Sequence, residues 1–161
     1  MTSTETEVQT ASAAWGDLHA LIGKPFASSW IEVGEGARAD FDRAAFLGRG
    51  TPRMSQSAYP EGLVEGFHLL ALLDHLVGQV SYVESERWFG WNYGLDRVRF
   101  TSPITTVDRI RVVGEIAELT PRGEGVLVTY RCVVEVAGRE RPAMVATWKA
   151  LWLDESERDD R

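Results

Sequence analysis

The C-terminal half of the chain constrains the fold most, because three stretches there alternate between apolar and other residues. They cover residues 107–119, 126–136 and 143–153. Alternation over such lengths is typical of long antiparallel strands with one face covered. The short segments 121–125 and 137–141 contain Gly, Arg and Glu, and predict hairpin turns between these strands.

An apolar segment, 63–77, precedes these strands and predicts a helix. Its sequence, LVEGFHLLALLDHLV, is apolar almost all round, so we expect the helix to be buried inside the domain. Upstream, 11–22 and 37–47 predict short helices and 27–33 predicts a short strand. The segment 48–62 is rich in Gly and Pro and predicts irregular chain.

These elements together predict an α+β domain, in which an antiparallel sheet wraps around one central buried helix. That arrangement is the hot-dog fold. We expect one such domain over residues 11–153, a disordered tail over 1–10 and a charged tail over 154–161. A single curved sheet leaves an exposed edge, which favours a homodimer.

Charge and composition exclude several kinds of partner. The net charge is −7, which argues against nucleic acid and anionic membrane surfaces. The N-terminus has no secretory pattern and no apolar run is long enough to span a bilayer, so we expect a cytoplasmic protein. With one Cys and three His, we expect no disulfide within the chain, no metal site and no cofactor.

The segment Asn92–Phe100, NYGLDRVRF, is followed by Ser102-Pro103-Ile104. It resembles the NYGLxxVRFxxPV stretch of MaoC-like proteins, in the branch that includes nodulation protein N and is related to R-specific enoyl-CoA hydratases. The segments 21–33 and 67–76 resemble the start of the same domain and its central helix. The resemblance covers about 15–153 and implies a hot-dog fold that binds acyl thioesters, often to hydrate or dehydrate them.

The resemblance also implies a catalytic Asp and His, in a motif written G-D-x-N-P-x-H. Here Gly48 and Pro52 fit the motif, but Arg49 stands in place of the Asp and Met54 in place of the His. Neither replacement can act as a general base at neutral pH. The family's usual His-Gly at the start of the helix is Glu65-Gly66 here, and the Gly66 N–H remains a possible oxyanion donor.

Three residues are candidates for the chemistry in place of the missing pair. Glu65 and His68 are three residues apart on one helix, so their side chains can meet and move a proton. The structural alternative is a helix-dipole charge beside a core histidine. Arg49 could bind a carboxylate, phosphate or enolate oxygen, or could be a surface arginine.

Aromatic residues provide candidates for substrate binding. Trp88, Phe89, Trp91 and Tyr93 fall within six residues and could line a pocket for a hydrophobic chain, or form core and dimer contacts. Tyr59 in the irregular segment could donate a hydrogen bond, and Met54 and Gly66 complete the candidate binding residues.

The functional hypothesis is therefore an atypical MaoC-like lyase, of the dehydratase or isomerase type. Its substrate would be a small, hydrophobic, unsaturated acyl or polyketide-like molecule, with a possible thioester link to CoA or a carrier protein. Several alternatives remain open: a non-catalytic subunit of a heteromeric hydratase, a cyclase or cycloaddition catalyst of secondary metabolism that works by shaping its substrate, and a thioesterase.

Overall fold

The computed structural model describes residues 7–47 and 58–155. The elements in chain order are β1 (Ala11–Ala13), the 3-10 helix η1 (Trp15–Leu21), β2 (Pro25–Ala27), β3 (Ile31–Glu32), α1 (Gly34–Ala44), α2 (Gly66–Gly78), β4 (Ser81–Val83), β5 (Trp88–Phe100), β6 (Arg109–Arg122), β7 (Gly125–Val136) and β8 (Met144–Asp154).

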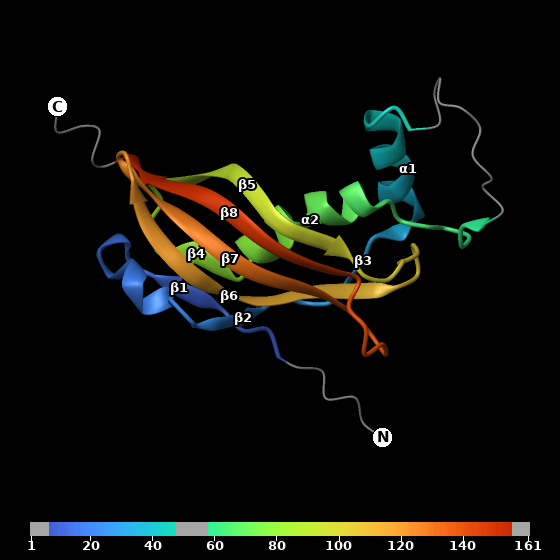
Figure 1. Cartoon of the computed structure of the whole chain (residues 1–161), viewed down its shortest axis with the longest axis horizontal. Coiled ribbons are helices and arrows are strands. Elements are labelled where there is room, and N and C mark those ends of the chain that lie inside the picture. Colours follow the sequence, from blue (N-terminus) through green and yellow to red (C-terminus); the bar gives the residue numbers. More distant parts are fainter. Residues whose placement is uncertain (1–6, 48–57, 156–161) are drawn as a thin grey trace.

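A six-stranded antiparallel sheet forms one layer of the molecule. Its order is β2-β6-β7-β8-β5, and β3 also pairs with β6. Figure 1 shows the sheet curving along α2, while α1 lies at one end of that helix. The α+β hot-dog fold expected from the sequence is confirmed.

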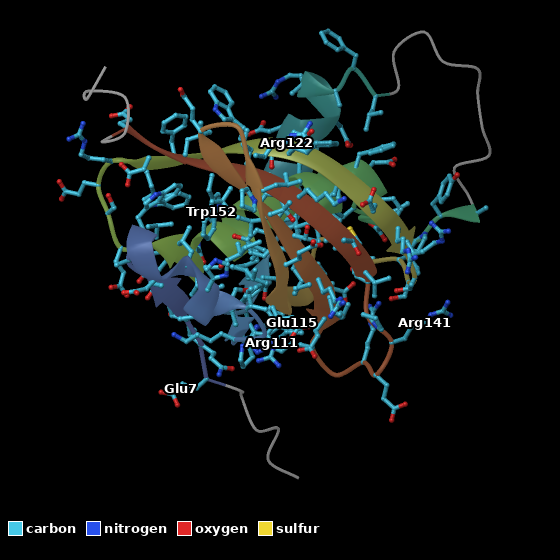
Figure 2. All side chains as sticks on the ribbon, turned by 60° about the vertical axis from the view of Figure 1, so that its left-hand side comes forward. Glu7, Arg111, Glu115, Arg122, Arg141 and Trp152 are labelled. Carbon is cyan, nitrogen blue, oxygen red and sulfur yellow. The ribbon has the colours of Figure 1, made fainter. Side chains whose placement is uncertain are left out.

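The three alternating stretches form β6, β7 and β8, as predicted, with ends that differ by three residues at most. In β8 every second side chain is buried, from Met144 to Asp154. These inward side chains pack with α2 in one apolar core. Figure 2 labels three charged residues of β6, Arg111, Glu115 and Arg122, among the side chains of the whole molecule.

The N-terminal region differs from the prediction. The segment 11–22 does not form one helix, because Ala11–Ala13 pairs in parallel with β4 and only Trp15–Leu21 is helical. Alanine favours helices, but propensity is a weak preference, and pairing with β4 overrides it here. The predicted helix 37–47 is also displaced, and spans Gly34–Ala44.

The predicted strand 27–33 is interrupted. Pro25–Ala27 and Ile31–Glu32 both pair with β6, but Ser28 between them bonds differently. Its hydroxyl accepts a hydrogen bond from the Val112 N–H at 3.0 Å, while its own N–H donates to the Val112 carbonyl. The side chain thus replaces a backbone carbonyl at this point of the ladder.

Helix α2 was predicted to be buried all round, and this is true of one face only. His68, Leu69, Leu73, Leu76 and Val77 are buried. Phe67 is 73% exposed, and Ala71 and Asp74 are also exposed. The helix therefore has a second face, which is apolar near its N-terminus and on which several side chains remain exposed.

Candidate active site

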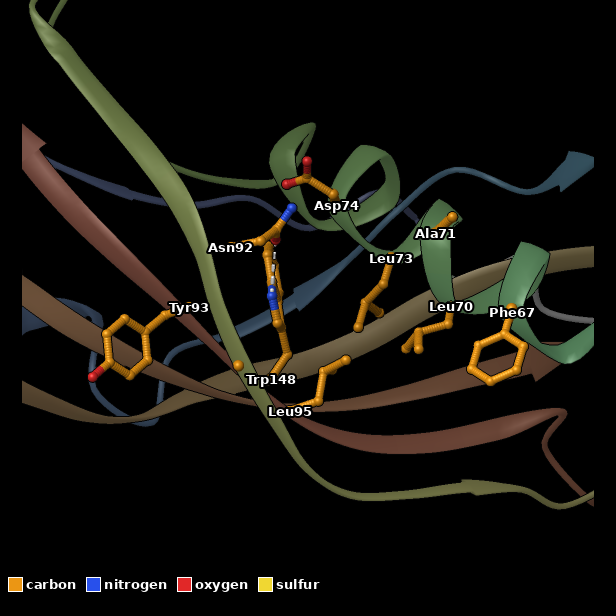
Figure 3. Close-up of a pocket in the computed structure, with 10 residues that line it drawn as sticks. Phe67, Leu70, Ala71, Leu73, Asp74, Asn92, Tyr93, Leu95 and Trp148 are labelled. Carbon is orange, nitrogen blue, oxygen red and sulfur yellow. Dashed lines mark hydrogen bonds between the residues drawn. The ribbon is translucent and has the colours of Figure 1, made fainter. Parts of the chain in front are cut away.

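A cavity of about 380 Å³ lies between the exposed face of α2 and strand β5. Figure 3 shows its lining side chains, from the helix and from the strands opposite. They are Phe67, Leu70, Ala71, Leu73, Asp74, Asn92, Tyr93, Gly94, Leu95 and Trp148. The volume and the mainly apolar lining suit a small organic ligand.

A smaller cavity of about 120 Å³ adjoins the first. Asp74, Asn92 and Trp148 line both cavities. The smaller one is otherwise mainly aromatic, with Trp88, Trp91, Tyr130 and Trp152 among its lining residues. An extended apolar ligand in the larger cavity would therefore reach these three shared residues and then an aromatic surface.

Aromatic packing keeps the shared wall of the two cavities in place. The Trp148 ring stacks on Tyr130 with centroids 5.0 Å apart, and Trp152 meets Tyr130 edge to face at 6.3 Å. Burial raises the pKa of the Tyr130 hydroxyl, so this group stays protonated at neutral pH. Its partner is Ser81, whose hydroxyl donates to it. The aromatic part of the wall is therefore neutral and held by several contacts.

A β-bulge in β5 determines which residues of this strand face the cavity. Asn92 pairs with Ala150 and Leu95 pairs with Trp148, so both point to the inner side of the sheet. Tyr93 lies in the register shift between Asn92 and Gly94. In a regular strand, residues three positions apart lie on opposite faces, so the extra residue at the bulge is what puts Asn92 and Leu95 on the same face.

Two of the sequence candidates, Gly66 and Glu65, are at the start of α2. Gly66 is the first helical residue, and a Cβ there would lie 3.0 Å from the Phe100 ring, so the close packing of this ring requires glycine. Glu65 is the N-cap residue, but its side chain makes no capping hydrogen bond and is exposed.

His68 is buried with a different neighbour from the one expected. Its ring stacks on Phe41 of α1 with centroids 4.4 Å apart and planes within 6°. Burial lowers the pKa of His68, and the nearby Asp42 carboxylate opposes this shift. Within the described part of the chain, His68 Nδ1 and Asp42 Oδ1 are buried and have no hydrogen-bond partner.

Asp42 was missed at the level of sequence, because nothing in its spacing relates it to His68. It belongs to another helix, 26 positions earlier, where it also accepts a hydrogen bond from Arg38 at 2.7 Å. The structure thus brings His68 beside Asp42. A Glu65–His68 contact is not found among the described residues.

The remaining sequence candidates are spread over the fold. Trp88 and Trp91 line the smaller cavity, although Trp91 is 62% exposed, and Tyr93 lines the larger one. Tyr59 is 51% exposed and is not among the residues that line either cavity. Arg49 and Met54 lie outside the described residues.

Within the described residues, neither the cysteine nor a group of metal ligands provides a further reactive site. Cys132 is buried, and burial raises the pKa of its thiol to about 12, so it stays protonated and unreactive. Residues 7–47 and 58–155 contain no cluster of three or more His, Cys, Asp or Glu that could hold a metal ion. The same ranges contain no helix long and apolar enough to cross a membrane.

Known proteins share both sequence and fold with this chain. No family model matches it. The 3-hydroxyacyl-thioester dehydratase Z of Mycobacterium tuberculosis is 32% identical over 147 residues, which cover 91% of this chain and 80% of that protein. The chain belongs to the MaoC-like family of hot-dog proteins.

Two nodulation N proteins are similar to this MaoC-like chain. The one from Rhizobium meliloti is 29% identical over 142 residues, which cover 84% of this chain and 88% of that protein. The one from Rhizobium leguminosarum is 38% identical over 94 residues, and the match spans only 58% of either protein. The resemblance to the nodulation protein N branch is therefore confirmed.

Solved structures agree on the fold. A monoamine oxidase regulatory protein from Archaeoglobus superposes with a TM-score of 0.69 at 20% identity, over 88% of this chain and 96% of the other. A MaoC-like dehydratase from Rhodospirillum rubrum gives 0.60 at 16% identity, over 83% and 92%. At these identities the likeness extends to the fold alone.

Proposed function

We propose that this MaoC-like protein is a lyase that hydrates or dehydrates a hydrophobic acyl thioester. The observation that carries the proposal is the mainly apolar cavity beside α2, whose lining includes Phe67 and Leu70 near the start of the helix. The dehydratase among its relatives supports the reaction class. The acyl chain would lie along α2, with the thioester near Gly66.

Dehydration of a 3-hydroxyacyl thioester breaks two bonds and forms a double bond. A base removes a proton from C2, an acid protonates the departing C3 hydroxyl, and water leaves. We assign the proton transfers to His68, which is close to the start of α2 but lines neither cavity, with Glu65 as the second candidate, and polarisation of the carbonyl to the Gly66 N–H and Arg49. The proximity of Asp42 supports His68, since a carboxylate can orient an imidazole and stabilise its charged form.

The direct test is an assay of the isolated chain with enoyl thioesters of increasing length, in the hydration direction. We expect turnover with medium-length chains, and a loss of about 10²-fold or more in His68→Asn. Activity that is unchanged by His68→Asn and Glu65→Gln together would contradict these assignments. No turnover alone, but turnover after a candidate partner chain is added, would instead favour a non-catalytic subunit of a heteromeric hydratase.

The same structure supports a homodimer. Strand β5 ends the sheet, so one of its edges has no partner in the described chain. Large apolar side chains are exposed on this strand and beside it: Phe67, Trp91, Tyr93, Leu95 and Phe100. Burying them against a second copy would also close the cavity, since Phe67, Tyr93 and Leu95 line it.

A further inference from the structure

One charged side chain, that of Asp74, stands among the lining residues of both cavities. Within the described structure, its carboxylate has no hydrogen-bond or ion-pair partner. It lies at the far end of α2 from Gly66, eight residues along, which is about 12 Å along a helix axis. A ligand bound along α2 would therefore reach Asp74 with its distal part.

Asn92 lies opposite Asp74, and its orientation is fixed. Its Oδ1 accepts a hydrogen bond of 3.1 Å from Trp148 Nε1, and an indole N–H can only donate, so the oxygen of the amide must face Trp148. The amide nitrogen therefore points the other way, and Figure 3 shows it directed toward Asp74. The junction of the cavities thus presents a carboxylate acceptor and an amide donor.

These groups are poorly matched to a plain hydrocarbon chain. Such a chain would remove water from the Asp74 carboxylate and offer no hydrogen bond in return, and an unsatisfied polar group costs affinity. A hydroxyl or ammonium group at this depth would satisfy Asp74, and a hydroxyl oxygen could also accept from the Asn92 amide. The surrounding Trp148, Leu73 and Tyr93 would still pack on the apolar part.

We propose that Asp74 and Asn92 form a specificity site for a hydrogen-bond donor carried on the distal part of the acyl chain. This inference rests on the proposed function for the placement of the thioester at Gly66. The substrate class is then an oxygenated or aminated acyl thioester, and simple fatty acyl chains are selected against. Asp74 and Asn92 act in recognition and take no part in proton transfer.

The experiment compares three probes of equal length, the N-acetylcysteamine thioesters of octanoic, 8-hydroxyoctanoic and 8-aminooctanoic acid. Tryptophan fluorescence reports binding, because Trp148 and Trp88 line the cavities. We expect the hydroxylated or the aminated probe to bind about tenfold or more tightly than the plain one. The two polar probes distinguish a hydroxyl from an ammonium group as the preferred donor.

Three variants make this test specific. Asp74→Leu should reverse the preference in favour of the octanoyl probe, and Asp74→Asn should remove any preference for the amine while a hydroxyl is still tolerated. His75→Leu is the matched control, because His75 is exposed on the same turn but lines neither cavity. It should leave the order of affinities unchanged.

The outcomes separate this inference from the proposed reaction. Preferential binding of a polar probe without turnover of any thioester would support the specificity site and contradict the lyase. Turnover of the enoyl thioesters, together with equal affinity for all three saturated probes, would support the lyase and overturn the specificity site. A preference that survives in Asp74→Leu would also overturn it, and binding of none of the probes would overturn both.

Discussion

The side chain of His68 is enclosed between two helices, where its charged form is disfavoured. Burial lowers its pKa, and this outweighs the opposing effect of Asp42. The Phe41 ring covers one face of the imidazole. In the unfolded chain the same imidazole would titrate near its ordinary pKa of about 6.5. Acid therefore favours the unfolded chain at this position, because the unfolded chain binds the proton more readily.

The free energy of unfolding should reflect this titration. His68→Phe keeps a flat ring against Phe41 but cannot be protonated. The stability contribution of neutral His68 is complete above the ordinary pKa and is lost as the pH falls below it. We expect the wild type to lose more stability than His68→Phe between pH 7 and pH 5, measured by urea denaturation. Equal losses of stability in the two proteins would mean that His68 has the same pKa in the folded and the unfolded chain.

Glu65 gives a second prediction at the residue scale. If its carboxylate moves a proton, Glu65→Gln should lower turnover by about 10²-fold or more and leave the fold intact. The side chain is exposed and makes no capping hydrogen bond, so circular dichroism and the melting temperature should hardly change. An unaltered rate would mean that Glu65 is not catalytic and serves only as a negative charge at the positive N-terminal end of the α2 dipole.

At the scale of elements, the pairing of β6 with β7 depends on one glycine. Gly114 pairs with Cys132, and a Cβ at Gly114 would lie 2.2 Å from the Arg131 carbonyl oxygen and 2.8 Å from the Phe26 ring. A backbone atom cannot move aside as a flexible side chain can. The two strands and β2 would have to separate to admit even a methyl group.

Gly114→Ala should therefore destabilise the fold by about 1–3 kcal/mol or more, as overpacking of a core does. Guanidinium denaturation measures this directly. The matched control is Gly36→Ala in α1, where a Cβ would meet nothing within 4 Å. There the same substitution should stabilise the helix by up to about 1 kcal/mol. A similar effect at both sites would contradict the close approach inferred for β6 and β7.

The elements differed in how far the sequence predicted them. Strands β6, β7 and β8 were predicted closely, because each has one face in water and one in the core, which produces alternation. Strand β5 gave no such signal, since its two bulges, after Asn92 and after Asp96, break the period of two. The segment Ala11–Ala13 became a strand through pairing with Ser81–Val83, a contact 70 positions away that no local pattern encodes.

The candidate site was predicted less completely than the fold, for a physical reason. Tyr93 and Trp88 were placed near a cavity from their aromatic character, but Asp74 and Asn92 were not. Their importance arises from facing each other across α2 and β5, and that depends on the tertiary fold. Asp42 approaches His68 for the same reason, and nothing in residues 38–44 indicates it.

At the scale of the whole molecule, the open edge of β5 governs assembly. One chain has a mass of 17.9 kDa, and a homodimer would have twice that mass in sedimentation equilibrium. Leu95→Lys should shift the protein toward the monomer, because it puts a charge among the exposed apolar residues beside the free edge. Val107→Lys is the control, since Val107 is 80% exposed but precedes β6, away from that edge. A wild-type monomer would contradict the homodimer.

The bulge at Tyr93 changes which positions of β5 face inward, as far as the second bulge after Asp96. Before it, the inner side chains occupy even positions such as Trp88, Gly90 and Asn92, and after it they are at an odd position, Leu95. Deleting the extra residue would restore a regular pleat with the same partners on β8, whereas deleting a residue elsewhere in β5 would turn one half of the strand to the other face. The cavity should thus tolerate many substitutions along β5 but no change in its length outside the bulge, so homologues that bind other ligands should differ here in residue type and keep the spacing on either side of the bulge.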